Sequence, residues 1–184
     1  MEYQLDPVSR SLIHILWMEP KQVELYIRYS AVVAHDNTAK TNIYGLPLSI
    51  FVVVDNNYNT RPVAQAFLDD ETLESYAWSL RIMLQVLHIY PAVMITNADP
   101  TMDAAITQIY PQMKHLHCIW HISQNIPKNL KGKLHGNYEE FAKKFFQCRN
   151  KLSIKCFEHD YIKLIEDYPS AKNYLERLYK SKKS

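Results

Sequence analysis

The stretch that decides the fold reads P-A-V-M-I-T-N-A-D-P-T-M-D-A-A-I-T-Q-I-Y-P-Q-M-K-H-L-H-C-I-W-H, residues 91–121. Its first part, residues 92–96, is a short apolar run with β-branched side chains, which predicts a buried strand rather than a helix. Asp99 then suits an N-cap and Pro100 a first helical position, so a helix should begin there. The apolar stripe of this helix consists of Met102, Ala105, Ile106 and Ile109.

A second strand-like run, residues 113–120, follows that helix and carries Cys118-x-x-His121 at its end. Strand, turn, helix and strand in this order are typical of an α/β sheet. Open sheets of this class bind ligands or do chemistry beyond the carboxyl ends of their strands. We therefore expect the turn at residues 97–99 to lie at a functional edge.

Length and composition restrict the class of protein. With 184 residues and 47% hydrophobic content, the chain suffices for one domain, or a domain and a half, with a full core. Only 3 Gly are present and no Gly-rich phosphate loop occurs, which argues against a nucleotide-binding enzyme, and we expect no small-molecule substrate. A net charge of +2 permits contact with nucleic acid without requiring it. Three cysteines form no disulfide framework and no run could span a bilayer, so we expect an intracellular protein with no membrane partner.

The N-terminal half reads mainly as strands. Residues 1–22 form a lead-in, either a strand or a hairpin, and residues 23–35 become continuously apolar and predict a central strand ending at Asp36. Residues 46–55 are the strongest strand pattern in the chain, and residues 62–68 return after a polar turn. Short polar turns between these runs predict an antiparallel meander.

Helical patterns follow. Residues 69–71 open a helix with apolar residues at helical spacing up to Leu87, and beyond His121 strand signals vanish. The order βββαβαβ followed only by helices predicts an α/β fold, a mixed sheet with an all-helical insertion or appendage. The expected division has three parts: a lead-in at 1–22, a core at 23–131 and a helical region at 132–184.

Several motifs occur in an order that is specific as a set: Asp36-Asn-Thr-Ala-Lys-Thr-Asn42, Pro47-Leu48, Ala66-Phe-Leu-Asp-Asp-Glu-Thr72, Glu74-Ser75, Trp78, Thr96-x-x-Asp99-Pro100 and Cys118-x-Trp-His-Ile122 with Asn125. Together they resemble the transposase domain of Mutator-like elements (MULE), a family that includes the far-red-impaired-response proteins of plants. The likeness runs over residues 23–179, and no single motif carries it.

The resemblance implies an RNase H-like fold, a Mg²⁺- or Mn²⁺-dependent Asp/Asp/Glu site and cut-and-paste DNA transposition. It further implies DNA partners, namely transposon ends, and a nuclear location, and it leaves self-association into a homo-oligomer open. In this chemistry two divalent ions activate the attacking oxygen and stabilise the leaving oxygen at phosphorus. Mg²⁺ prefers carboxylate oxygens, so acids must project together from strand ends.

Asp36 matches the first catalytic acid of the family, although an Asx-turn residue would also fit its sequence context. Asn97 stands where the family has its second Asp, and a carboxamide supplies one weak oxygen ligand and no charge. Asp99 is a substitute for that acid or, given Pro100, an N-cap. The third acid, a Glu in an R-V-E-S-like stretch, has no match, and Glu158 reads as a solvated charge. Whether the chain is an enzyme therefore stays open.

Cys118 and His121 match a Cys-x-x-His landmark of the family and suit half a zinc site. Structural zinc needs about four protein ligands. The remaining His and Cys residues offer no convincing spacing to complete such a site: His115, His117, Cys148, Cys156 and His159. We therefore expect a buried Cys beside a hydrogen-bonded His, without zinc.

Lys128, Lys131 and Lys133 form a short basic run that either contacts DNA phosphates or is a solvated helix end. Two functions remain. The chain is a MULE transposase domain fragment, inactive as given because of Asn97 and the unmatched Glu. Alternatively, it is a domesticated, non-catalytic protein that associates with DNA as a regulator or scaffold.

Overall fold

The structure, a computed structural model, describes residues 1–38 and 42–181. It falls into two compact units, Met1–Cys118 and Ile119–Ser184, which we call the α/β unit and the helical unit. These units divide the chain differently from the three parts expected from the sequence. Residues 1–22 belong to the α/β unit because their hairpin joins its sheet, and the helical unit begins at Ile119 rather than at position 132.

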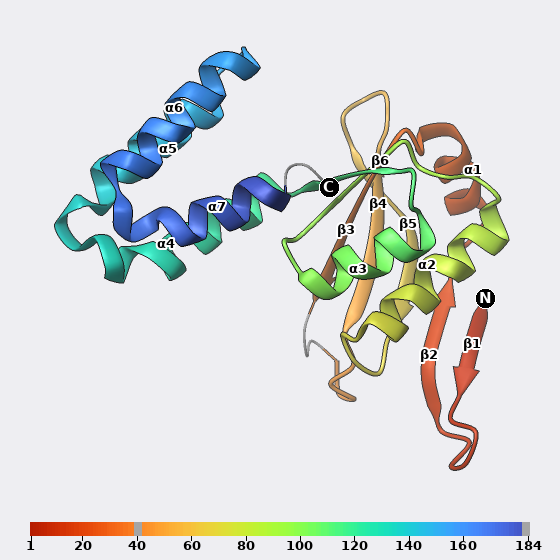
Figure 1. The fold of residues 1–184 in the computed structure, drawn as a ribbon. Helices are drawn as coiled ribbons and strands as arrows, with labels where there is room; N and C mark the ends of the chain where they lie inside the picture. Colours follow the sequence, from red (N-terminus) through yellow and green to blue (C-terminus); the bar gives the residue numbers. More distant parts are fainter. Residues whose placement is uncertain (39–41, 182–184) are drawn as a thin grey trace. The chain divides into compact units, whose positions relative to one another are not determined.

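The α/β unit contains one sheet of seven strands with helices between them (Figure 1). Its elements are β1 (Glu2–Leu5), β2 (Leu12–Trp17), α1 (Pro20–Tyr29), β3 (Val32–Thr38), β4 (Leu48–Val54), β5 (Thr60–Phe67), α2 (Leu73–Leu87), β6 (Val93–Thr96), α3 (Pro100–Ile109) and β7 (Lys114–His117). The strand order across the sheet is β1-β2-β5-β4-β3-β6-β7.

The sheet is mixed, as the sequence predicts. Strands β3, β4 and β5 pair antiparallel, which confirms the expected meander. Strand β6 pairs parallel with β3, and β7 pairs parallel with β6, because helices α2 and α3 carry the chain back between them. The carboxyl ends of β3, β6 and β7 therefore lie at one edge of the sheet.

The prediction of a strand from residue 23 onward is wrong for its first part, which forms α1. Pro20 occupies the start of this helix, and the Gln22 side chain accepts a hydrogen bond from the Glu19 backbone N–H at 2.8 Å. Tyr26 is fully buried, with Val23 packed against the same core. The apolar residues of this segment thus serve a helical face, and the strand begins only at Val32.

The strand prediction for residues 113–120 also needs correction. Strand β7 ends at His117, and helix α4 (Ile119–Leu134) begins two residues later. Cys118 is the last residue of the α/β unit, and its backbone N–H still donates to the Thr96 carbonyl at 2.6 Å. His121 lies in the first turn of α4, so the Cys-x-x-His pair is not at a strand end.

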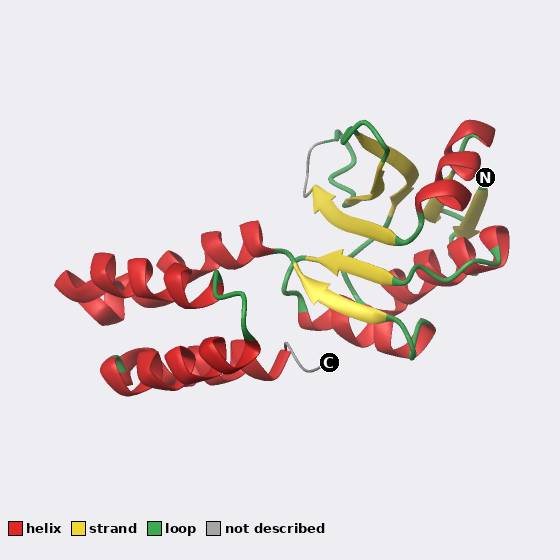
Figure 2. Cartoon of the chain, turned by 90° about the horizontal axis from the view of Figure 1, so that it is seen from above, coloured by secondary structure: helices red, strands yellow, loops and turns green. Residues whose placement is uncertain are grey.

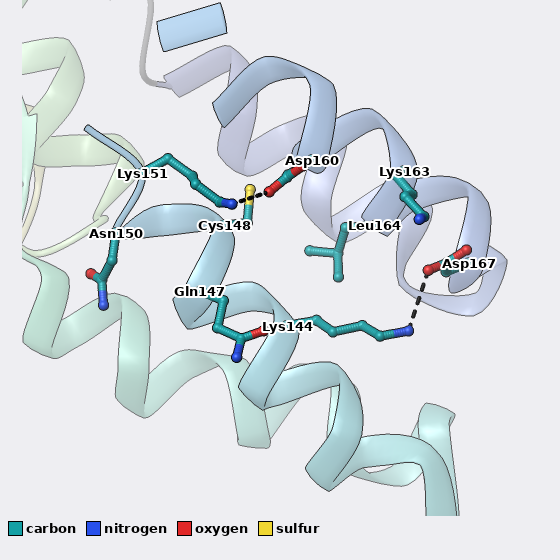
Figure 3. Close-up of a pocket in the computed structure, with 9 residues that line it drawn as sticks. All are labelled: Lys144, Gln147, Cys148, Asn150, Lys151, Asp160, Lys163, Leu164 and Asp167. Carbon is teal, nitrogen blue, oxygen red and sulfur yellow. Dashed lines mark hydrogen bonds and ion pairs between the residues drawn. The ribbon is translucent and has the colours of Figure 1, made fainter. Parts of the chain in front are cut away.

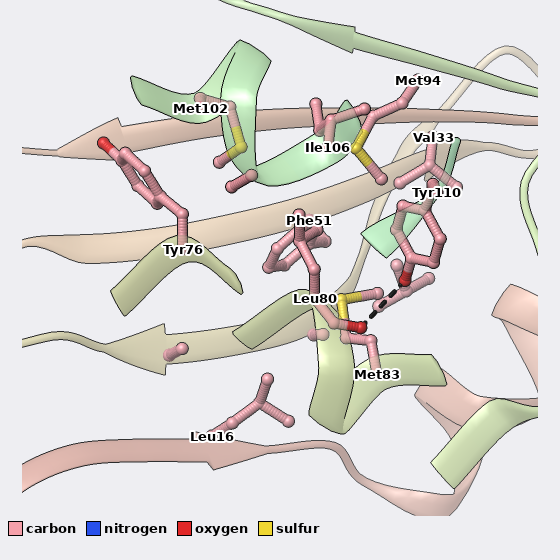
Figure 4. Packing of buried hydrophobic residues seen from close by; sticks show 14 of the residues in the cluster. Leu16, Val33, Phe51, Tyr76, Leu80, Met83, Met94, Met102, Ile106 and Tyr110 are labelled. Atoms are coloured by element: carbon pink, nitrogen blue, oxygen red, sulfur yellow. Dashed lines mark hydrogen bonds between the residues drawn. The ribbon is translucent and has the colours of Figure 1, made fainter. Parts of the chain in front are cut away.

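The core of the α/β unit lies between the sheet and the layer formed by α2 and α3, which lie side by side over one sheet face (Figures 1 and 2). Phe51 and Met94 come from the sheet and meet Leu80 and Met102 from the helices (Figure 4). The buried Tyr110 hydroxyl donates to the Leu80 carbonyl at 3.0 Å. Each Å² of apolar surface removed from water contributes about 25 cal/mol to stability. The contact between the sheet and these two helices is therefore the main stabilising contact of the unit.

The helical unit has its own core. Its elements are α4 (Ile119–Leu134), η1 (His135–Asn137), α5 (Tyr138–Arg149), α6 (Ile154–Asp167), η2 (Pro169–Ala171) and α7 (Lys172–Ser181). Phe141, Leu164 and Leu175 are buried together, and the Tyr161 hydroxyl donates to the Leu175 carbonyl at 2.8 Å. Within residues 119–181 no strand occurs, which confirms the expected helical region. Among the described helices, none has the length and apolar character needed to cross a membrane.

Candidate functional site

Asp36 in β3 and Asn97, the first residue after β6, lie at matching positions of two neighbouring parallel strands. The register of β3 and β6 pairs Ala34 with Ile95, so two residues further on it leads to Asp36 and Asn97. Paired strands lie about 4.8 Å apart, which brings the two backbones close together. The positions of Asp36 and Asn97 are thus adjacent at the carboxyl edge of the sheet.

Asp36 lies on the sheet face that α2 and α3 do not cover. Val33 and His35 are buried on the helix-covered face, and side chains alternate along a strand, so Asp36 is directed to the other face, where it is exposed. One oxygen of its carboxylate accepts the backbone N–H of Asn37 at 3.0 Å. The carboxylate is accessible from solvent. The motif that begins at Asp36 continues through Ala39, Lys40 and Thr41, which lie outside the described residues.

Asp99 caps helix α3. Its side chain accepts the Thr101 backbone N–H at 2.8 Å, and its carbonyl accepts the Asp103 N–H at 3.0 Å. This matches the N-cap that Pro100 predicts. One carboxylate oxygen of Asp99 is therefore committed to the helix end, where the helix dipole also favours its negative charge.

A network that sequence reasoning missed lies on the helix-covered face of the same edge. The Asn37 amide donates to Glu71 at 2.9 Å and to the Tyr76 hydroxyl at 2.7 Å, and that hydroxyl donates to Glu71 at 3.3 Å. Burial, followed by the charges of Glu71, Asp99 and Asp36, raises the pKa of Tyr76 well above its ordinary value. The negative charges of three acids from separate segments therefore disfavour ionisation of one hydroxyl. From the sequence, Glu71 was predicted only as one of the acids at the start of a helix, and its contact with Asn37 was not predicted.

The donor set at this edge does not fit a pair of Mg²⁺ ions. Asp36 offers a carboxylate, Asn97 a neutral carboxamide, and Asp99 a carboxylate already used as a cap. Two divalent ions need several anionic oxygens, both to hold the ions and to offset their mutual repulsion. The geometry of a two-acid edge is present, whereas the charge is not.

A second cluster lies beside this edge and combines Asp103 of α3 with His115 and His117 of β7. His117 Nε2 lies 3.0 Å and 3.1 Å from the two Asp103 carboxylate oxygens, and His115 Nδ1 lies 3.7 Å from Oδ1. His115 Nε2 lies 2.8 Å from the Thr96 hydroxyl. Burial lowers the pKa of His115, against the opposing effect of the Asp103 charge. The i, i+2 spacing of the histidines on a strand was the sequence signal for this cluster, since it puts both rings on one face.

The other expected site residues are not part of either cluster. Cys118 is half-buried in the α/β unit and His121 belongs to α4 of the helical unit. Cys148 is buried, while Cys156 and His159 are exposed in the helical unit. Glu158, expected as a solvated charge, is instead half-buried and accepts the Tyr179 hydroxyl at 2.9 Å.

Lys128, Lys131 and Lys133 are exposed on the second half of α4. Within the described parts of the chain no ion pair includes them. The last two lie in the final turn, where the helix dipole favours cations, so their position fits a solvated helix end as well as a phosphate contact.

A cleft of about 630 Å³ lies between α5 and α6 in the helical unit (Figure 3). Two of the three lysines that line it are paired with acids, with Lys151 2.9 Å from Asp160 and Lys144 3.3 Å from Asp167. These pairs leave little net charge in the cleft to attract a charged ligand, and they lie in a different unit from Asp36. The cleft is therefore not part of the candidate site.

Comparison with known proteins decides the family. The family model described as the MULE transposase domain matches residues 32–125, just over half of the chain. The chain belongs to the MULE transposase domain family. The matched range of this MULE domain covers β3 to the start of α4 and so includes Asp36, Asn97, Asp99, Asp103, His115 and His117.

Curated relatives of the MULE domain include plant proteins from Arabidopsis thaliana. "Protein FAR1-RELATED SEQUENCE 4" is 28% identical over 85% of this chain and 22% of its own length. "Protein FAR1-RELATED SEQUENCE 5" is 28% identical over 87% of this chain and 20% of its own length. "Protein FAR-RED IMPAIRED RESPONSE 1" is 25% identical over 76% of this chain and 17% of its own length. The resemblance seen in the sequence motifs is thereby confirmed, and the chain spans about a fifth of the length of these relatives.

Proposed function

We propose that this MULE domain is the RNase H-like core of a DNA transposase in which replacement of the second acid by Asn97 has removed strand cleavage. The observation that carries the proposal is the matched placement of Asp36 and Asn97 on adjacent parallel strands. The scaffold of a two-acid site is intact at that edge. The side chain at the second position departs from what the chemistry needs, and the third acid of the family has no match in the sequence.

The sheet supports the RNase H-like assignment. Its order β5-β4-β3-β6-β7 joins three antiparallel strands to two parallel ones, with the first and fourth strands of this set, β3 and β6, as neighbours. In such a sheet the acids belong at the carboxyl ends of β3 and β6. Asp36 and Asn97 occupy these places. The β1–β2 hairpin extends the sheet beyond β5 and leaves that arrangement unchanged.

The distribution of charge supports DNA as the partner. Of the chain's 21 Lys and Arg, 14 fall at positions 119–184, which hold only 7 of its 19 Asp and Glu. The helical unit is therefore strongly basic, whereas the α/β unit is acidic. Basic surfaces bind the phosphate backbone without reading sequence. We place the contact with transposon ends on the helical unit, in a protein acting in the nucleus.

A second function is favoured by the same substitution at position 97. A transposase-derived protein that keeps the basic helical unit but lacks a metal-binding edge could persist as a DNA-associated regulator or scaffold. Both functions share DNA binding without cleavage. They differ in the DNA bound: a transposition protein selects element ends over unrelated duplex, and a regulator or scaffold that no longer takes part in transposition does not.

A cleavage assay tests the main proposal. The chain is incubated with a nicked duplex and Mn²⁺, alongside Asp36→Asn and Asp99→Ala variants. We expect no cleavage above the level of the Asp36→Asn variant. Metal-dependent cutting by the wild type that either substitution abolishes would show a working site and overturn the proposal.

A further inference from the structure

The cluster of Asp103, His115 and His117 has donors that suit a metal other than Mg²⁺. Both imidazole side chains are 9% exposed, and the Asp103 carboxylate is 34% exposed, so the cluster is sheltered but reachable from solvent. One ring nitrogen of His115, one of His117 and an oxygen of the Asp103 carboxylate all lie within 4.8 Å of one another. Two imidazoles and a carboxylate form a set that Zn²⁺ and related ions prefer, whereas Mg²⁺ prefers oxygen ligands.

The Thr96 hydroxyl holds one nitrogen of the His115 ring. It lies 2.8 Å from His115 Nε2 and also donates to the Asn97 carbonyl at 2.8 Å. The other ring nitrogen, Nδ1, lies 3.7 Å from an Asp103 carboxylate oxygen. In the neutral tautomer with the proton on Nε2, Nδ1 is an acceptor that can bind a cation.

Two acceptors that face each other across this distance repel unless a cation lies between them. A tetrahedral ion with bonds of about 2.0–2.1 Å separates its ligand atoms by about 3.3 Å. The separations of Asp103 Oδ1 from His117 Nε2 and His115 Nδ1, 3.0 Å and 3.7 Å, lie on either side of that value. One ion placed between the three side chains would satisfy both contacts at once.

We propose that Asp103, His115 and His117 bind one Zn²⁺-type ion, with solvent as the fourth ligand. The site joins α3 to β7 and, through Thr96, lies next to the position of Asn97. Thr96 orients the His115 ring from outside the ligand set, as hydrogen-bond partners of metal-bound histidines commonly do. The bound ion would link α3 to β7 at the carboxyl edge of the sheet, close to the start of α3.

The test uses Co²⁺ as a spectroscopic probe and Zn²⁺ as its competitor. The purified chain, stripped of metal, should bind one Co²⁺ with the visible absorption of a tetrahedral nitrogen and oxygen site and without a thiolate charge-transfer band. One equivalent of Zn²⁺ should displace it and raise the melting temperature. Changes outside the ligand set of a metal weaken its binding by about 10–100-fold. His117→Gln and Asp103→Asn, which each remove a ligand, should weaken binding by more than that.

Control variants separate this site from the Cys-x-x-His pair. His159→Gln removes an exposed histidine of the helical unit, and Cys118→Ser removes the thiol beside His117. Both should keep the affinity of the wild type, with far-ultraviolet circular dichroism confirming that all variants fold. Binding that survives His117→Gln and Asp103→Asn, or that is lost in Cys118→Ser with a thiolate band in the wild type, would overturn the proposal. Absence of stoichiometric Co²⁺ binding by the wild type would overturn it as well.

Discussion

Asp36 and Asn97 each lie two residues beyond the Ala34–Ile95 pair that joins β3 to β6; Asp36 is still within β3, and Asn97 directly follows β6. One side chain is a carboxylate and the other a carboxamide. This pair combines a preserved backbone position with an altered charge. The first prediction addresses that alteration directly.

Asn97→Asp should raise the affinity of the chain for Mn²⁺ by at least about tenfold. The substitution adds a second carboxylate about 5 Å from the backbone of Asp36, and two acids at that spacing bind a divalent ion far better than one. Isothermal titration with Mn²⁺ measures the effect. Asn129→Asp adds the same charge at an exposed position of α4 that has no acid near it in the sequence, and should give no gain. An equal gain in affinity in both variants would contradict the pairing of positions 36 and 97. So would a gain in Asn97→Asp that is lost with Asp99→Ala but kept with Asp36→Ala.

Asp99→Ala should lower the free energy of unfolding by about 1 kcal/mol. The carboxylate accepts the Thr101 N–H at the start of α3, and removal of an N-cap typically costs about 0.5–2 kcal/mol. Urea denaturation measures the change. Asp99→Ser keeps an N-cap acceptor and should recover most of the loss. A stable Asp99→Ala protein with altered Mn²⁺ affinity would instead make Asp99 a metal ligand.

His35 should make the folded state less stable as the pH falls from about 6.5 toward 3. Burial lowers the pKa of His35 to about 3, while its ring packs on Phe51 and its Nε2 lies 2.6 Å from the Ser49 hydroxyl. Between these pH values the unfolded chain binds a proton that the folded chain does not. Stability therefore decreases on acidification by about 1.4 kcal/mol per pH unit from this group.

The contribution of His35 is isolated by comparing variants. His35→Gln cannot titrate, so its stability should fall less steeply between pH 6.5 and 4 than that of the wild type. His159→Gln, in which an exposed histidine is removed, should keep the slope of the wild type. Parallel slopes for all three proteins would show that His35 is protonated in the folded state over this range.

Replacement of the α4 lysines should weaken duplex binding and its dependence on salt. For each phosphate that the protein no longer neutralises, the slope of log affinity against log salt should become shallower by about 0.9. The test protein carries Lys128→Gln, Lys131→Gln and Lys133→Gln. Fluorescence anisotropy at several salt concentrations measures the slope.

A matched control removes the same charge from exposed positions of the α/β unit. It carries Lys21→Gln, Arg28→Gln and Arg81→Gln. We expect the slope of this control to equal that of the wild type. If both triple variants reduce the slope equally, DNA binding depends on net charge rather than on α4.

The sequence predicted those elements whose local pattern and tertiary role agree. Strands β4 and β5 were recognised because their apolar and β-branched residues are bounded by polar turns, and α3 because Asp99 and Pro100 mark its start. Helix α1 was missed because its apolar residues fit alternation almost as well as helical spacing. Its start is marked by Glu19 and Gln22 rather than by a common N-cap residue.

Contacts between distant residues were the part of the site that the sequence could not predict. Asp36 and Asn97 were placed by the motifs around them. Asp103 and His117, in contrast, are 14 positions apart and meet only because α3 returns along the sheet to β7. Spacing alone could not join these two residues, although the pair of histidines on one strand face was visible.

The described sheet ends in two short strands, β1 and β7, of four residues each. An edge strand exposes unpaired backbone groups that can recruit a strand from another molecule, and the risk grows with length and apolar character. Glu2 and Lys114 place exposed charges on these two edges. Such brief, charged borders make poor templates for continued pairing, so copies of this protein that assemble should meet through helices or loops rather than by extending one sheet into another.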